Sequence, residues 1–291
     1  MSNLAKEGIL LDQYYAVTHP SEPNYLATIG GDFWGLPDDD EYHIPPKRVN
    51  VTYQFFYLSF DRPVVSPPLL ISWRKRISPG HLTRKICPLT VTKDSSELQP
   101  FYTDDYLSRS CSCQQYSYSS VNYLDTSQLP YTFWVRKHDP LIVYDSVASV
   151  DSRRTRIRNF NDFAVDVNAS ALPQWMFVTP NMVDDGHDTT IDFAGDWVDF
   201  WLAPLLNDTN FNDNRTLILL TFDETEMYNI NNHIFALLLG GAIPDGARGT
   251  VDSTYYTHYS SLSTVEANWG LGSLGRGDTN KYVPFPQIAQ A

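Results

Sequence analysis

The 291-residue sequence lacks any run of 18 or more apolar residues, so it contains no candidate membrane-spanning helix. It has only three cysteines, and an odd number predicts no disulfide framework. Basic residues are scarce, with 21 Lys and Arg against 34 Asp and Glu and a formal net charge of −13. Because an acidic chain repels phosphate backbones, this balance argues against nucleic-acid binding. The 42% of hydrophobic residues is enough for the core of a globular domain.

Asparagine sequons are present in both halves of the chain. Three of them are candidate glycosylation sites at Asn168, Asn207 and Asn214, and a fourth lies at Asn50. Asn207 and Asn214 lie close together in a polar stretch, as glycosylated surface loops do. Met1–Glu7 is polar and has no signal-peptide pattern. We therefore expect a secreted, extracellular glycoprotein whose leader is not part of this chain.

The second half of the chain alternates between strand-like and helix-like patterns. Gln174–Thr179 and Ile234–Leu239 are short apolar runs, and Thr216–Phe222 is a continuous run that predicts a strand buried on both faces. In Thr190–Leu206, aromatic residues recur at three- and four-residue spacing, which predicts a helix. The order strand, helix, strand, strand predicts an α/β layered fold around a central sheet.

Residues 49–133 follow neither pattern. This segment holds all three cysteines and a run rich in Ser and Tyr, and it shows no sustained period of 2 or 3.6 residues. A structureless loop of this length is improbable inside a compact domain. We therefore interpret 1–291 as a single domain in which 49–133 is an anomalous, poorly ordered insertion.

Ser21 and Asn24 form the first candidate group for chemistry. Ser21 lies near the start of a predicted helix, where free N–H groups and the helix dipole favour an anion and lower the cost of an alkoxide. Asn24 lies one turn further on and could donate its amide to a phosphoryl oxygen. The alternative is that Ser21 is only an N-cap and Asn24 a turn residue.

The adjacent acids Asp223 and Glu224 form the second group. They follow the predicted strand Thr216–Phe222 directly, and open α/β sheets place their sites at the carboxyl ends of strands. Two neighbouring carboxylates repel each other unless a cation lies beside them, so the pair predicts a bound divalent ion. The alternative is an ordinary acidic turn.

Asp185 and His187, in the sequence DDGHD, form the third group. Both could bind a metal or contact substrate, and His187 could act as general acid for a leaving alcohol; the alternative is a capped polar loop. For His138 and His258 a hydrogen-bonded structural role is the simpler interpretation. A hydroxyl nucleophile, an amide donor and a cation site together suit phosphoryl transfer or ester hydrolysis.

Six sequence blocks occur in an order that is typical of one family. They read THPSEPNYLATIGGD, VRKHDPLIVYDSV, LPQWMFVTPNMVDDGHDTT, RTLILLTFDETE, LLLGGAIP and DSTYYTHYSSLSTVEANWGL. Together they resemble the fungal secreted acid phosphatases, which belong to the phosphoesterase family of the alkaline-phosphatase superfamily and are related to bacterial phospholipases C. The resemblance covers Gly8–Ile44 and Val135–Leu274.

This resemblance implies an alkaline-phosphatase-like three-layer α/β sandwich with a central, mainly parallel sheet. It also implies that a small phosphate monoester is hydrolysed through a serine phospho-enzyme with the help of a divalent metal ion, whose identity the sequence does not show. By position, Ser21 resembles the nucleophile and Asn24 the phosphoryl contact. Asp223 and Glu224 resemble the metal-binding acid pair. The remaining residues that match family site positions are Asp185, His187, His258 and His138.

The chain departs from the family in two places. The resemblance implies a Glu-Asn pair that holds the metal on a strand upstream of the nucleophile, but Met1–Gly8 contains no such pair. We therefore expect the first strand of the fold to be absent. The segment 49–133 does not resemble the family. When Trp73–Pro79 and Thr83–Ser96 are reverse-translated with permitted codons and read two bases later, they can encode peptides that resemble the family's sequence in this region. We hypothesise that this segment is translated in the wrong frame.

The sequence thus predicts a phosphoric monoester hydrolase of the acid phosphatase type. Two alternatives stay open: a phosphodiesterase or phospholipase C-like hydrolase of the same superfamily, and an inactive, truncated or mis-spliced product. The sequence makes no prediction of the oligomeric state.

Overall fold

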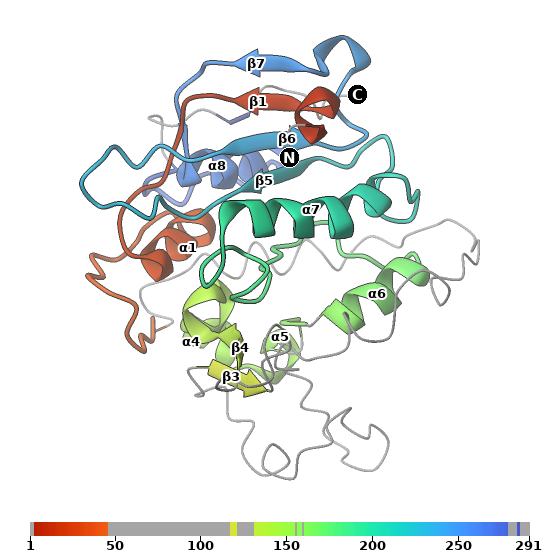
Figure 1. Ribbon diagram of the computed structural model, residues 1–291. Coiled ribbons are helices and arrows are strands. Elements are labelled where there is room, and N and C mark those ends of the chain that lie inside the picture. Colours follow the sequence, from red (N-terminus) through yellow and green to blue (C-terminus); the bar gives the residue numbers. More distant parts are fainter. Residues whose placement is uncertain are drawn as a thin grey trace. The chain divides into compact units, whose positions relative to one another are not determined.

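The computed structural model describes residues 3–45, 117–120, 131–278 and 284–285, except 155 and 159, with only the backbone described at 117–120, 131–134 and 161. The chain forms two compact units, one made of Met1–Asp40 and Thr189–Ala291 and the other of Glu41–Asp188. Helices and strands occur together, so the structure is of the mixed α/β class (Figure 1). None of the helices in the described part is long and apolar enough to cross a membrane.

The first unit is built on a four-stranded sheet in the order β5-β6-β1-β7 (Figure 1). β1 (Ile9–Leu11) pairs antiparallel with β6 (Ala236–Leu239) and parallel with β7 (Thr250–Asp252). β5 (Ile218–Thr221) pairs antiparallel with β6. The strands described in this sheet therefore make two antiparallel pairings and one parallel pairing, and they form a mixed sheet rather than the predicted mainly parallel one.

The connection between β5 and β6 explains their antiparallel pairing. Residues 222–235 contain no helix, so they return the chain directly beside the strand it has just left. Parallel neighbours need a crossover connection, which is usually a helix. At the far end of β6, Gly240 has φ +109°, and a Cβ there would lie 2.2 Å from the carbonyl oxygen of Thr216. Only glycine allows the backbone to approach so closely to the start of β5.

The predicted strands differ in how well they match the structure. The prediction for Ile234–Leu239 is confirmed, because all four residues of β6 are buried. The residues of β5 are only partly buried, so the predicted burial of Thr216–Phe222 on both faces is wrong; β5 lies at an edge of the described sheet. Gln174–Thr179 forms no strand. It lies between Pro173 and Pro180, which lack the N–H groups that a ladder requires.

A single apolar cluster fixes the N-terminal segment against the chain's last third. It includes Leu11 and Tyr14 from one side and Leu238, Ile243 and Tyr256 from the other, all at most 2% exposed. β2 (Tyr14–Tyr15) pairs parallel with β8 (Tyr256–Thr257) and continues the same contact. Burial of side chains of this size stabilises the fold by about 1.5–3 kcal/mol each.

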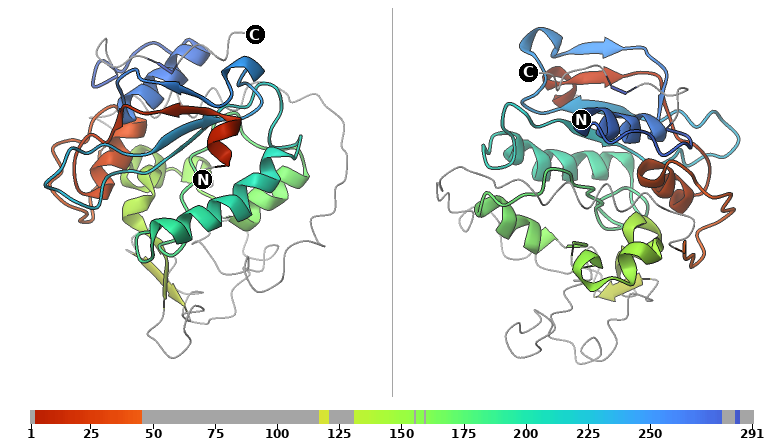
Figure 2. Two further views of the ribbon diagram at one scale, coloured as in Figure 1. Left: turned by 45° about the horizontal axis from the view of Figure 1, so that its top comes forward. Right: turned by 180° about the vertical axis from the view of Figure 1, so that it is seen from behind.

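Helices lie on both sides of this sheet (Figures 1 and 2). α7 (Ile191–Leu206) confirms the predicted helix, and Thr190 caps it by accepting a bond from the Phe193 N–H at 3.3 Å. α8 (His258–Trp269), on the other side, begins with a capping box between Thr257 and Ser260. α1 (Ser21–Gly30) packs against α8 and ends at Gly31, whose φ of +69° suits a glycine C-cap.

The second unit consists of a hairpin and short helices. β3 (Ser117–Ser120) pairs antiparallel with β4 (Tyr131–Val135). The helices are η5 (Arg136–His138), α3 (Pro140–Val143), α4 (Asp145–Ala148), α5 (Asp151–Arg154) and α6 (Phe160–Asn168). Most of the predicted insertion at 49–133 lies outside the described residues, so its interpretation as a poorly ordered insertion stays a prediction.

A buried acid pair ties the segment after α8 to the helix itself. The Asp278 carboxylate accepts hydrogen bonds from Ser273 Oγ at 2.6 Å and from the N–H groups of Arg276 and Leu274 at 2.8 and 2.5 Å. Burial raises the pKa of Asp278, but these bonds outweigh burial and hold the pKa below its usual range. Burial, together with the charge of Asp278, raises the pKa of Glu266 to about 8. Glu266 is therefore protonated in the folded chain at neutral pH.

We expect the free energy of unfolding to fall as pH rises from about 4.5 to about 8. Over that range Glu266 is protonated in the folded chain but ionised in the unfolded chain, so rising pH favours the unfolded state. Glu266→Gln should flatten this part of the dependence, measured by urea unfolding at about pH 5 and about pH 8. Glu7→Gln, at an exposed acid, should keep the wild-type dependence. Identical pH dependence for wild type and Glu266→Gln would contradict the expectation.

Candidate active site

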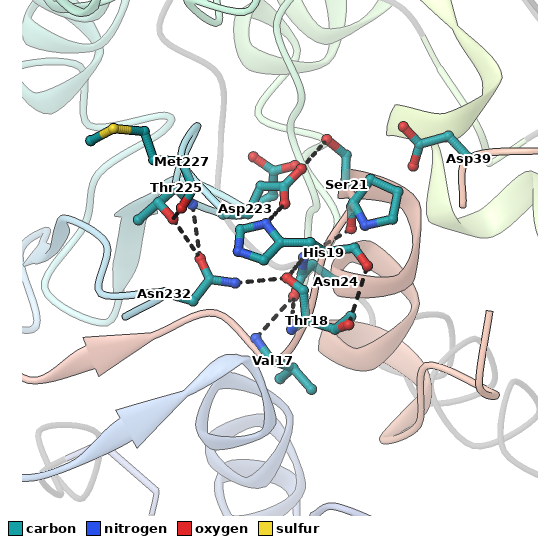
Figure 3. A network of polar contacts seen from close by, with 12 residues as sticks. Val17, Thr18, His19, Ser21, Asn24, Asp39, Asp223, Thr225, Met227 and Asn232 are labelled. Atoms are coloured by element: carbon teal, nitrogen blue, oxygen red, sulfur yellow. Dashed lines mark hydrogen bonds and ion pairs between the residues drawn. The ribbon is translucent and has the colours of Figure 1, made fainter. Parts of the chain in front are cut away.

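Ser21 is the first residue of α1, and Pro20 occupies the N-cap position before it. The Ser21 side chain does not cap the helix; its Oγ donates to Glu224 Oε1 at 3.0 Å. Ser21 is only 5% exposed. The interpretation of Ser21 as a mere N-cap is therefore wrong. Its hydroxyl donates instead to the carboxylate of Glu224, which is 203 residues further along the chain (Figure 3).

Glu224 contacts Ser21, the first residue of α1, and His19, which lies two residues before it. Its Oε1 accepts from Ser21, and its Oε2 contacts Nδ1 of His19, whose ring stacks on Tyr228 with centroids 4.1 Å apart. Burial raises the pKa of Glu224 and the neighbouring charge of Asp223 adds to this, while the bonds from His19 and Ser21 oppose it. The net direction is upward, so the Glu224 carboxylate is a stronger base than an exposed glutamate.

Asp223 is held through its backbone. His258, 3% exposed, contacts the Asp223 carbonyl oxygen through Nε2 at 2.6 Å. A carbonyl oxygen only accepts, so Nε2 carries the proton, and Nδ1 is the nitrogen that faces the Tyr14 hydroxyl at 3.4 Å. Burial lowers the pKa of His258, which favours this neutral form. His258 thus orients the backbone that carries the acid pair.

Asn24 is fully buried, and backbone groups use its whole amide. Its Oδ1 accepts from the Val17 and Thr18 N–H groups at 2.9 and 3.0 Å. Its Nδ2 donates to the carbonyl oxygens of Thr18 and Pro20 at 2.7 and 3.1 Å. In this arrangement Asn24 shapes the loop that leads into Ser21, and its predicted contact with a phosphoryl group stays a prediction.

Asn232 is a site residue that the sequence analysis missed. Its Nδ2 donates to the Thr18 carbonyl oxygen at 2.7 Å, and its Oδ1 accepts from the N–H and Oγ1 of Thr225 at 2.8 and 3.2 Å (Figure 3). It lies in the polar run Asn229–His233, where nothing in the sequence distinguishes one asparagine from its neighbours.

Asp185 and His187, the third group, lie beside the predicted residue His138 in the second unit. His138 Nδ1 lies 3.4 Å from Asp185 Oδ2. The rings of His138 and His187 lie edge to face, with their centroids 5.6 Å apart. The Asp185 Oδ1 accepts from the His187 N–H at 2.8 Å. His138 is 6% exposed, whereas His187 is exposed. The three residues therefore form one cluster, and their roles in binding stay predictions.

The contacts of His187 fix its tautomer in this arrangement. Nε2 faces the Lys137 ammonium at 3.3 Å, and an ammonium only donates, so this nitrogen carries a lone pair. Nδ1 faces Asp188 Oδ1 at 2.9 Å and carries the proton. In this tautomer Nε2 carries no proton, and the predicted general-acid role of His187 stays a prediction.

The acid pair has the donor chemistry of a divalent cation site. Asp223 Oδ2 is buried and has no hydrogen-bond partner among the described residues, and Glu224 and Ser21 add further oxygen atoms beside it. Hard divalent cations prefer such oxygen ligands. The part of the chain that the structure describes contains no group of three or more His, Cys, Asp or Glu that could hold a metal ion. The residues present therefore fit part of a metal site, and further ligands would complete it.

The three predicted glycosylation asparagines are all exposed. Asn168 and Asn207 donate to the carbonyl oxygens of Ala164 and Ala203 at 2.8 and 2.9 Å, one helical turn earlier. Asn214 follows α7 in an exposed turn. Their modification stays a prediction, and Asn50 lies outside the described residues.

Comparison with known proteins defines the class to which this arrangement belongs. The model of the Phosphoesterase family matches residues 1–272, and the chain belongs to this family. The resemblance seen in the six sequence blocks is thereby confirmed.

Several fungal relatives are close in sequence. The chain is 43% identical to a probable acid phosphatase of Kluyveromyces lactis, over 96% of this chain and 56% of the relative. It is 42% identical to an acid phosphatase of Aspergillus fumigatus, over 96% and 52%. It is 39% identical to a phosphate-repressible acid phosphatase of Penicillium chrysogenum, over 96% and 56%. The chain thus spans about half the length of the curated relatives it matches.

Replacing Asn24 by alanine separates its two possible roles. We expect Asn24→Ala to lower the free energy of unfolding by about 2–4 kcal/mol, because the N–H groups of Val17 and Thr18 lose their acceptor and the carbonyls of Thr18 and Pro20 each lose a donor. Asn231→Ala, at an exposed asparagine, should change it by less than about 0.5 kcal/mol. Denaturant unfolding measures both. Unchanged stability together with reduced turnover would instead support a direct contact with the phosphoryl group.

Proposed function

We propose that this chain carries the catalytic centre of a phosphoric monoester hydrolase of the acid phosphatase type, with Ser21 as the nucleophile. The observation that carries the proposal is the 3.0 Å bond from Ser21 Oγ to Glu224 Oε1 at the first turn of a ten-residue helix. The fungal relatives named as acid phosphatases support the substrate class, a small phosphate ester.

The first proposed step is in-line attack of Ser21 Oγ on phosphorus. The Oγ–P bond forms, the bond from phosphorus to the alcohol oxygen breaks, and the Ser21 proton passes to Glu224. The raised pKa of Glu224 favours this transfer. The departing alcohol takes its proton from solvent water.

In the second step water attacks the phosphoserine. A new P–O bond forms, the Oγ–P bond breaks, the proton of the attacking water passes to solvent, and Glu224 returns its proton to Ser21. The net reaction is hydrolysis of one ester to an alcohol and inorganic phosphate. A divalent ion held by Asp223 and by ligands other than Glu224 would offset the charge of the phosphate while Glu224 accepts the proton.

We also propose that the whole fold is the alkaline-phosphatase-like three-layer sandwich and that the protein is a secreted glycoprotein. The helices on both sides of the sheet and the family membership support the fold (Figure 2). The exposure of Asn168, Asn207 and Asn214 supports glycosylation. A mainly parallel sheet would require strands beyond the four described.

Replacing the nucleophile tests the proposal directly. Ser21→Ala should lower kcat for p-nitrophenyl phosphate by about 1,000-fold or more, because no phospho-enzyme can form. Ser253→Ala, at an exposed serine, should keep wild-type turnover. Unchanged turnover in Ser21→Ala would remove Ser21 from the mechanism. Faster hydrolysis of bis(p-nitrophenyl) phosphate than of the monoester would favour the phosphodiesterase alternative.

The metal proposal has a test that does not depend on activity. After treatment with a chelator, addition of Mg²⁺, Mn²⁺, Ca²⁺ or Zn²⁺ should raise the melting temperature, because a ligand that binds only the folded state stabilises it. Asp223→Asn should abolish this rise, whereas Glu226→Gln, at an exposed acid three residues away, should keep it. No rise with any of the four ions in wild type would contradict the proposal.

A further inference from the structure

We propose that Asn232 is a positioning residue that fixes the loop before Ser21, at Thr18, relative to the loop after Glu224, at Thr225. This proposal rests on the function proposed above. Asn232 contacts neither Ser21 nor Glu224 in the hydrogen bonds of its side chain. It contacts the backbone of the two loops that carry them. Its role would therefore be to set the geometry between the reacting groups (Figure 3).

The backbone of Asn232 is itself fixed. Its carbonyl oxygen accepts from the Ala16 N–H at 2.8 Å, and the Ile234 N–H donates to the Tyr14 carbonyl at 3.0 Å. Between these two bonds, His233 forms an antiparallel bridge with Tyr15. The backbone of Asn232–Ile234 is thus hydrogen-bonded to the N-terminal segment, which fixes the position from which the Asn232 side chain extends.

From this base the side chain reaches both loops. Nδ2 binds the Thr18 carbonyl oxygen, three residues before Ser21, and Oδ1 binds Thr225, the residue after Glu224. Thr18 and Thr225 are more than 200 residues apart in the sequence. One neutral amide therefore links the two loops through bonds separate from the Ser21–Glu224 bond.

The Thr18 carbonyl oxygen accepts from Asn232 and from Asn24, each at 2.7 Å. Asn24 fixes this loop to the helix that begins at Ser21, and Asn232 fixes it to the loop of the acid pair. The two amides have different partners beyond Thr18, so loss of Asn232 should leave α1 intact. What it should change is the distance between Ser21 and Glu224. A displacement of about 1 Å between reacting groups can lower a rate about 100-fold.

The test compares variants of the full chain. Asn232→Ala removes both arms of the link, and Asn232→Asp keeps the acceptor for Thr225 but loses the donor to Thr18 at nearly constant volume. Asn231→Ala is the matched control, since Asn231 is the exposed neighbour. We expect kcat for p-nitrophenyl phosphate, measured well below the melting temperature of every variant, to fall about 10- to 100-fold in both Asn232 variants, with KM close to that of the control.

A second measurement does not need activity. In Asn232→Ala the Thr225 amide loses its acceptor, so its hydrogen exchange should become about fivefold faster than in Asn231→Ala. Thr225→Val keeps this N–H bond and removes only the hydroxyl, so its amide at position 225 should exchange as in the control. Exchange in Asn232→Ala within twofold of the control would overturn the proposal.

The activity assay distinguishes this proposal from the function on which it rests. If Ser21→Ala is inactive but Asn232→Ala and Asn232→Asp turn over at the control rate, the positioning role is refuted and the function stands. Turnover that survives Ser21→Ala refutes the function, and the exchange of the Thr225 amide then decides alone whether Asn232 holds the two loops.

Discussion

The pairing of β1 with β6 and β7 is the contact on which the candidate site depends. It places the first 24 residues beside the segment from Ile218 to His258, although loop closure over this distance has an entropic cost. The burial of Leu11, Tyr14 and Leu238 in one apolar cluster offsets that cost. Once this pairing exists, the chain that leaves β2 runs directly into Ser21, and the chain that leaves β5 runs directly into Asp223.

Neutral hydrogen bonds to the backbone give the site its geometry. Asn24 and Asn232 hold the loop before Ser21, and His258 holds the carbonyl of Asp223. None of these bonds needs a charged side chain, so they do not depend on the protonation state of Glu224. In the proposed reaction, preorganised polar groups of this kind would lower the reorganisation that accompanies phosphoryl transfer.

Local patterns predicted some elements well and failed where pairing partners decide the outcome. The helix at Ile191–Leu206 and the buried strand at Ala236–Leu239 follow from spacing and from a continuous apolar run. Gln174–Thr179 has a similar apolar pattern but forms no strand. Pro173 and Pro180 flank it, and neither has an N–H group for strand pairing. The direction of each pairing depends on the route of the connecting loops, which composition does not encode.

The sequence by itself determined the family and the residue types of the candidate site, because each candidate lies within a short block of neighbouring residues that is recognisable on its own. It also placed Ser21 at a helix start, since that choice is local. Only the tertiary structure decided that Ser21 faces Glu224 and that Asn24 turns inward. It alone revealed Asn232 as the link between the two loops. The bonds of Ser21 to Glu224 and of Asn232 to Thr18 join residues more than 200 positions apart, and a hydrogen bond across such a distance leaves no local sequence pattern.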